Sequence, residues 1–166
     1  MSVSRQKPNY TIPALLALAA ALIALVTYFG VVAPAVHQGA YKSFVSGLSR
    51  STAYAYQNDS LVVTDGEGRS FPVTGDQVYF AYQTLTTVGA GTGRSKLPEG
   101  EADLSLDFGD GSRLRLWGVK VRHQSGSMAD GIFVCYENQE GKQYLYDNAT
   151  VSLPYFQKAY RAEAFS

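Results

Sequence analysis

The sequence predicts an α+β protein in which an N-terminal transmembrane helix precedes a small domain of antiparallel β-hairpins with helices on one face. Three observations predict this fold class. A long uncharged segment lies near the N-terminus, short strands then alternate with glycine-rich turns, and amphipathic helical patterns separate the strands. We expect a cytoplasmic tail over residues 1–10, a transmembrane helix over 11–36, an amphipathic juxtamembrane helix over 37–58 and an extracytoplasmic α+β domain over 59–166.

The transmembrane helix is predicted from a segment that carries no charged side chain between Ile12 and Val36. As a helix this segment would extend about 37 Å, against about 30 Å for the hydrocarbon core of a bilayer. Its Leu, Ile, Val and Phe side chains favour insertion by roughly 3 to 6 kcal/mol. The lipid bilayer is therefore the first expected partner.

The flanking charges predict the orientation. Arg5 and Lys7 precede the segment, and no further Lys or Arg follows until Lys42. The positive-inside rule then places the N-terminus in the cytoplasm and the domain outside the cell membrane. A cleaved signal peptide is the alternative, because the residues before position 36 resemble a cleavage site after Ala35. The apolar stretch is longer than a typical signal and contains Pro34 within that site, so an uncleaved anchor is favoured.

The juxtamembrane helix is predicted from apolar residues at helical spacing. They are Tyr41, Phe44, Val45, Leu48, Thr52 and Ala55. This stripe contains few strongly hydrophobic residues, so we expect it to pack on the following sheet rather than on lipid. Pro34 favours a kink ahead of it.

Three strand pairs are predicted after this helix. The first joins 61–64 to 70–73 through a turn with two glycines, and Pro72 restricts its strand to a sheet edge. The second joins 104–108 to 113–116 around Gly109–Gly111, and the third joins 132–137 to 143–146. After Gly118 the apolar positions change parity, which predicts a β-bulge there.

Two further helices complete the domain. Thr74, with Gln77 three residues on, has capping-box spacing and predicts a helix that ends at Gly89. A glycine-rich loop is expected over 90–100. A short terminal helix is expected to start at Ser152, with proline in its first turn.

Composition excludes several functions. Of the 14 Lys and Arg, two precede the apolar segment, so 12 remain after it against all 14 Asp and Glu; this near-neutral balance argues against nucleic-acid binding. Cys135 is the single cysteine, so no intramolecular disulfide or thiolate metal cluster forms, and its apolar surroundings predict a small buried residue.

Catalytic and cofactor motifs are also missing from the sequence. Residues 89–94 lack the ending of a phosphate-binding loop, and the acids between Glu99 and Asp110 do not follow a calcium-loop pattern. No nucleophile elbow and no zinc-protease motif occurs. We therefore expect no cofactor, no metal and no enzymatic activity.

A possible interaction surface is predicted from basic and aromatic residues. The candidates are Arg113, Arg115, Lys120, Arg122, Tyr79 and Tyr82. Such residues suit an anionic partner or a protein contact. The alternative, which the pattern favours for the basic residues, is a solvated strand face paired with acids such as Asp107.

The run 61–73, a following helix and the run 104–116 resemble small extracytoplasmic domains of Gram-positive bacterial membrane proteins and lipoproteins. In those domains a strand pair, a helix and further strand pairs end in a Tyr- and Leu-rich segment, here 144–146 and 153–156. The resemblance is one of topology over about residues 60 to 160. It implies a bacterial cell-envelope setting and transfers no site residues.

The leading hypothesis is a non-enzymatic, membrane-anchored binding or accessory module with a protein partner at the membrane. The first alternative is a pilin-like or other structural envelope subunit, against which stands the lack of an acid early in the apolar helix. The second alternative is an envelope hydrolase.

Overall fold

The computed structural model describes residues 11–89, 91–122 and 126–161. The predicted tail over residues 1–10 lies outside these ranges. The chain forms two compact units, Met1–Gly39 and Ala40–Ser166. The division falls within one helix, a few residues after the predicted end of the apolar segment.

The first unit is helical in its described part. Helix α1 (Thr11–Thr27) is followed by a π-helical turn, η1 (Tyr28–Val32), and then by the start of α2 (Ala33–Asn58). The N–H of Ala33 donates to the carbonyl of Tyr28, five residues earlier. Pro34 has no N–H for the carbonyl of Gly30, so the α-helical pattern cannot be maintained here and a π turn replaces it. Taken one by one, none of the helices in the described ranges is both long enough and apolar enough to cross a membrane.

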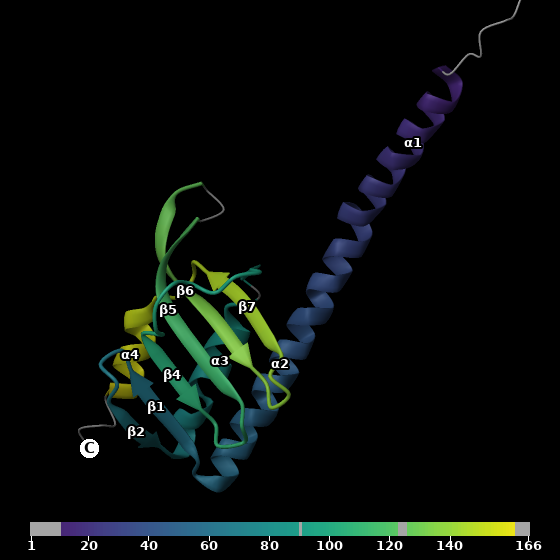
Figure 1. Ribbon diagram of the computed structural model, residues 1–166. Helices are drawn as coiled ribbons and strands as arrows, with labels where there is room; N and C mark the ends of the chain where they lie inside the picture. The colour runs from purple at the N-terminus through teal and green to yellow at the C-terminus, as the bar shows by residue number, and fades with distance from the viewer. Residues whose placement is uncertain (1–10, 90, 123–125, 162–166) are drawn as a thin grey trace, which may run out of the picture. The chain divides into compact units, whose positions relative to one another are not determined.

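The second unit contains a seven-stranded antiparallel sheet with the order β2-β1-β4-β5-β6-β7-β3 (Figure 1). The strands are β1 (Leu61–Asp65), β2 (Ser70–Val73), β3 (Thr92–Gly93), β4 (Leu104–Asp107), β5 (Arg113–Arg122), β6 (Met128–Glu137) and β7 (Gln143–Asn148). All three predicted strand pairs form, and Pro72 lies on the edge strand β2 as predicted. The α+β class is therefore correct for this unit.

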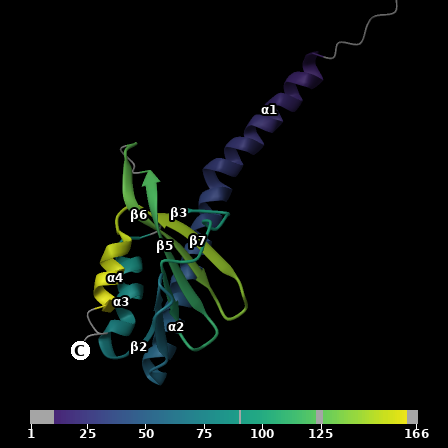
Figure 2. The ribbon, with the colours of Figure 1, turned by 60° about the vertical axis from the view of Figure 1, so that its left-hand side comes forward.

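Helices cover one face of the sheet (Figure 2). They are the part of α2 from Ala40 onward, the 3-10 helix η2 (Gly75–Tyr79), α3 (Phe80–Thr87) and α4 (Leu153–Arg161). From the predicted stripe, Phe44, Leu48 and Ala55 are buried against the sheet. The inward side chains of the strands complete this main core, for which burial of apolar area is the dominant stabilising term.

The opposite face, here called the outer face, carries a second and smaller apolar cluster. Trp117, Phe133 and Cys135 are buried there, and Leu97 and Ala102 pack on them from the segment between β3 and β4. Gly100 in the same segment accepts a hydrogen bond from the indole N–H of Trp117, at 3.4 Å. The burial of Cys135 confirms the reading of its apolar surroundings.

The predicted β-bulge at Gly118 is wrong. The pairing of β5 with β6 runs without a slip from Arg113 opposite Glu137 to Arg122 opposite Met128. The apolar pattern changes parity because β5 contributes first to the main core and then to the outer cluster. Gly118 instead faces α4, where a Cβ atom would lie 3.2 Å from Leu153.

Two other local predictions are corrected. Thr74 makes no capping hydrogen bond, and the helix begins with a 3-10 turn. Gly75 has a φ of +64°, which turns the chain away from the geometry that a capping box needs. The predicted loop over 90–100 also contributes β3, which pairs with β7 through Thr92 and Gly93.

Candidate functional site

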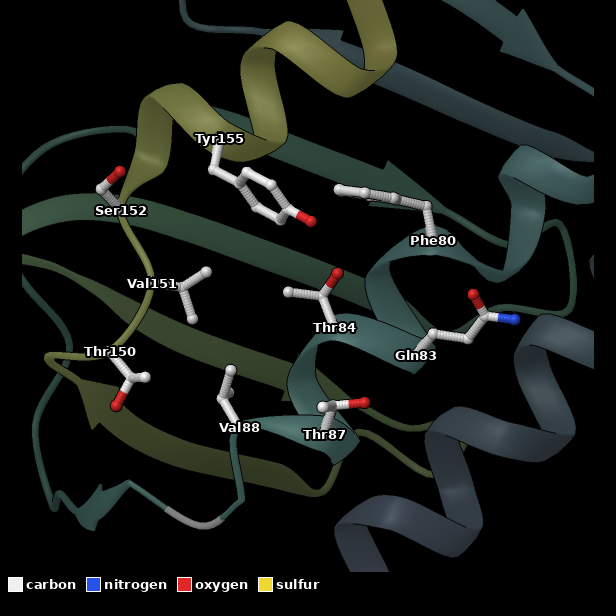
Figure 3. Close-up of a pocket in the computed structure, with 9 residues that line it drawn as sticks. All are labelled: Phe80, Gln83, Thr84, Thr87, Val88, Thr150, Val151, Ser152 and Tyr155. Atoms are coloured by element: carbon white, nitrogen blue, oxygen red, sulfur yellow. The ribbon is translucent and has the colours of Figure 1, made fainter.

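The candidate site is a groove between α3 and α4, with a volume of about 520 Å³ (Figure 3). In Figure 3, side chains from α3, from the β7–α4 connection and from α4 converge on the same space. The lining residues are Phe80, Gln83, Thr84, Thr87, Val88, Thr150, Val151, Ser152 and Tyr155. A volume of this size lies within the range of ordinary small-molecule sites.

Aromatic contacts fix the two walls of the groove relative to each other. The ring of Phe80 lies 5.3 Å from that of Tyr155, 5.7 Å from Phe156 and 5.6 Å from Tyr160, measured between centroids. The hydroxyl of Tyr160 accepts a hydrogen bond from the N–H of Ala81, at 3.2 Å. That N–H lies in the first turn of α3. Burial raises the pKa of Tyr160, so the neutral phenol persists well into the alkaline range.

The third wall is the connection from β7 to α4, and a buried side chain holds it. Asn148 is 6 % exposed, and its Oδ1 accepts the N–H of Thr150 at 2.7 Å. The N–H of Tyr155 donates to the carbonyl of Ser152, at 3.2 Å, which closes the first turn of α4. The rim of the groove is therefore set by local hydrogen bonds as well as by packing.

The polar side chains of the groove make no hydrogen bonds to the part of the chain that the structure describes. They are Gln83, Thr84, Thr87, Thr150, Ser152 and Tyr155. Thr86, on the same helix but outside the groove, behaves differently, because its hydroxyl donates to the carbonyl of Tyr82 at 2.7 Å. The groove therefore presents unused donors and acceptors around an apolar floor of Phe80, Val88 and Val151.

The groove carries no formal charge at neutral pH, because none of its nine lining residues is Asp, Glu, Lys, Arg or His. General acid–base catalysis near neutral pH relies mostly on those residue types. Within the described ranges, no group of three His, Cys, Asp or Glu side chains is placed to hold a metal ion.

A second polar region lies between α2 and the sheet, beside a pocket of about 250 Å³. The hydroxyl of Tyr136 lies 2.9 Å from Ser51 Oγ, which lies 2.7 Å from Ser112 Oγ, and Ser112 Oγ lies 2.5 Å from Asp110 Oδ1. Gln139 Nε2 donates to the other carboxylate oxygen, at 2.9 Å. Ser51, Ser112 and Tyr136 are buried, Asp110 is half-buried and Gln139 is exposed. We call these five residues the buried network.

The ionised carboxylate of Asp110 can only accept hydrogen bonds, so Ser112 and Gln139 donate to it. The Ser112 hydroxyl is also the donor toward Ser51 Oγ, so its single proton is shared between Asp110 and Ser51. Either hydroxyl can donate in the bond between Ser51 and Tyr136. Burial alone would raise the pKa of Asp110, but hydrogen bonds from Ser112, Gln139 and Ser51 outweigh it and hold the pKa below its usual 3.8. Burial raises the pKa of Tyr136.

The predicted basic residues do not share one surface. Arg113 and Arg115 project from the outer face, whereas Lys120 and Arg122 project from the other side of β5, because successive side chains alternate. Arg113 pairs with Asp107 at 3.0 Å, as the solvated-face alternative predicts. Arg115 lies 3.3 Å from Glu137, and its guanidinium lies 5.7 Å from the centre of the Trp117 ring. Lys120 pairs with Asp130 at 2.6 Å, and Arg122 Nε donates to the carbonyl of Gly126.

The predicted tyrosines lie on the helical side and apart from the basic residues. The ring of Tyr79 lies 5.1 Å from that of Tyr56 of α2, at an interplanar angle of 53°, and Tyr82 packs against the main core. Both are neighbours of groove residues along the chain, but neither lines the groove. The sequence carries a signal for one wall only, the polar face of α3 formed by Gln83, Thr84 and Thr87, and none for the opposite wall.

No protein-family model, curated protein or solved structure matches the chain. Function therefore has to be inferred from the chemistry of the groove and from the apolar N-terminal segment, because a fold by itself does not specify an activity.

Proposed function

We propose that the protein is a single-pass, membrane-anchored binding module, non-enzymatic, with its N-terminus in the cytoplasm and its sheet domain outside the cell membrane. The observation that carries the anchor is the apolar surface of the first helical unit. Leu22, Ile23 and Val26 are between 55 and 68 % exposed, and residues 12–36 carry no charge. Apolar surface of this extent is characteristic of contact with lipid or protein.

Helix α1 by itself has 17 residues and rises about 26 Å, which is short of the roughly 30 Å of a hydrocarbon core. The π turn and the first residues of α2 follow it directly along the chain and add the missing rise. Backbone groups in these helical turns are satisfied locally, as a bilayer requires. The anchor in this proposal therefore consists of α1, η1 and the first residues of α2 together.

Binding, in this proposal, takes place in the α3–α4 groove. Its unused hydroxyl and amide groups and its fixed walls support recognition, and its lack of an acid or base at neutral pH favours binding over hydrolysis. The first test is fractionation. The full-length chain should remain with membranes after alkaline carbonate extraction, and release into the soluble fraction would rule out the anchor.

The orientation is tested by cysteine labelling of intact cells. Cys135 is buried, and replacing it by alanine provides a background without a native thiol. In that background Glu140→Cys, an exposed position, should react with a membrane-impermeant maleimide, whereas Ser4→Cys should react only after permeabilisation. The reverse labelling pattern would overturn the orientation.

The binding role is tested by photo-crosslinking in intact cells. A photoreactive amino acid at Gln83, which is exposed in the groove, should give a discrete adduct. The matched control is Asp76, which is also exposed but lies in η2 outside the groove. The same adducts from both positions, or none from Gln83, would contradict binding in the groove.

A further inference from the structure

The polar lining of the groove has a specific hydrogen-bonding character. Five hydroxyls and one amide surround it, and each of these side chains both donates and accepts. Their best complement is a ligand whose own polar groups also donate and accept and carry no charge. The hydroxyl groups of a sugar have this property.

The apolar part of the groove supplies the other feature that a sugar needs. Tyr155 is 51 % exposed, and its ring is tilted by 40° against the half-buried ring of Phe80. Val88 and Val151 continue this floor (Figure 3). An aromatic surface with polar groups at its margin fits the C–H face of a pyranose ring while the equatorial hydroxyls reach the rim.

Other ligand classes fit the groove less well. A charged ligand would be desolvated without any opposite charge in the lining. A peptide that binds by strand addition needs a free strand edge, and both long walls of this groove are helices. A lipid chain would bury the polar rim without satisfying it.

We propose that the α3–α4 groove binds a neutral glycan, an uncharged saccharide chain. This inference rests on the proposed binding role of the same groove. It adds the class of ligand, and Thr84, Thr87 and Gln83 are the hydrogen-bonding residues while Tyr155 and Phe80 form the stacking surface. A ligand can approach from solvent, because lining residues on both walls, Gln83, Thr87 and Tyr155, are exposed.

The test is a titration of the full-length chain in a detergent without a sugar headgroup, so that the micelle does not compete. The probes are neutral oligosaccharides of hexose and of N-acetylhexosamine, with oligogalacturonate as the charged comparison and an uncharged peptide as the non-sugar comparison. Saturable binding of at least one neutral series, and of neither comparison, is expected. Equal or tighter binding of oligogalacturonate or of the peptide would overturn the inference.

Variants locate the binding to the groove. Thr87→Val removes one hydroxyl at nearly constant shape and should weaken binding roughly 3- to 10-fold. Tyr155→Ala should weaken it by about tenfold or more, and Tyr155→Phe, which keeps the ring, should lose less. Thr74→Val is the matched control, because Thr74 is exposed, makes no side-chain capping bond and lies outside the groove. Binding that is unchanged in Thr87→Val and Tyr155→Ala overturns the inference.

The failure of this inference is distinguishable from that of the proposed function. A protein adduct at Gln83 in cells, together with no saccharide binding in the titration, leaves the binding module standing and overturns the glycan. A chain that carbonate releases from membranes, but that binds a neutral oligosaccharide through Tyr155, supports the glycan and overturns the anchor.

Discussion

The groove and the buried network use the same side-chain groups in opposite ways. In the network, the hydroxyls of Ser51, Ser112 and Tyr136 are buried and hydrogen-bonded to one another, and this series of hydrogen bonds ends at the carboxylate of Asp110. In the groove, the hydroxyls of Thr84 and Thr87 have no partner in the described ranges. A hydroxyl that is satisfied inside the protein stabilises the fold, whereas one left open to solvent is available to a ligand at no cost to folding.

This difference has a structural origin. Ser51 lies in the part of α2 that faces the sheet, and Gly47 one turn earlier lets the ring of Tyr136 approach so closely that a Cβ would lie 2.8 Å from it. Buried polar groups must then be paired, because an unpaired one costs roughly 1 to 3 kcal/mol. Helices α3 and α4 meet through Phe80 and Tyr160, farther along their axes, and leave the hydroxyls between them in water.

The largest expected effect separates the two regions by stability. Ser112→Ala removes the hydroxyl that donates to Ser51 and to Asp110, and it should lower the free energy of unfolding by about 2 kcal/mol. Thr87→Val in the groove should change it by less than about 0.5 kcal/mol. Urea titration of the full-length chain, followed by the fluorescence of the buried and single Trp117, measures both. Equal losses would remove the distinction.

A smaller effect on stability is expected when the same substitution, tyrosine to phenylalanine, is made in the network and in the groove. Tyr136→Phe and Tyr155→Phe each delete one phenolic hydroxyl. The first removes a buried hydrogen bond to Ser51 and should cost about 1 kcal/mol, whereas the second removes a hydroxyl without a partner in the described chain and should cost almost nothing. Thermal unfolding of the two variants side by side gives the difference, and a larger loss for Tyr155→Phe would reverse the assignment.

The smallest expected effect is a pH dependence of the unfolding free energy that arises from Asp110 in the network. The folded state holds the pKa of Asp110 below 3.8, so the unfolded state binds its proton first as the pH falls. The stabilisation is complete above pH 3.8 and disappears as the pH drops through the lower folded value. Unfolding free energies between pH 5 and about pH 2.5 should therefore fall less steeply in Asp110→Asn than in the natural chain. Parallel curves would show that Asp110 does not contribute.

Strand pairs and helices were predictable because their signals are local. Alternating residues in 104–108 and 113–116 with glycines between them specify a hairpin, and the structure has it. The parity change after Gly118 was just as clear, but its cause was not local. A strand that contributes side chains to cores on both faces of a sheet has the same apolar pattern as a bulged strand that faces a single core. The sequence does not show that Trp117 and Phe133 meet under the segment that contains Leu97.

The groove could not be predicted because its walls are far apart in the sequence. Residues 80–88 and 150–155 meet only through the packing of Phe80 on α4, and no short motif marks either segment. The buried network left a fainter signal. Ser51 falls beside the apolar stripe of an amphipathic helix, where a polar residue needs a partner. Its partners are distant in the sequence, because Ser112 lies in the β4–β5 turn and Tyr136 on β6.

The pairing of β3 with β7 sets an order on the assembly of the domain. Thr92 and Gly93 must wait for Tyr146 and Asp147, which leave the ribosome much later. Until then the segment from Arg94 to Asp103 is not held at its Arg94 end, since the ion pair of Arg94 is with Asp147. Contacts between distant parts of a chain form slowly. The cover over Trp117 therefore cannot be completed before β7 is in place, and a nascent chain that stops short of β7 exposes an indole that the finished protein conceals.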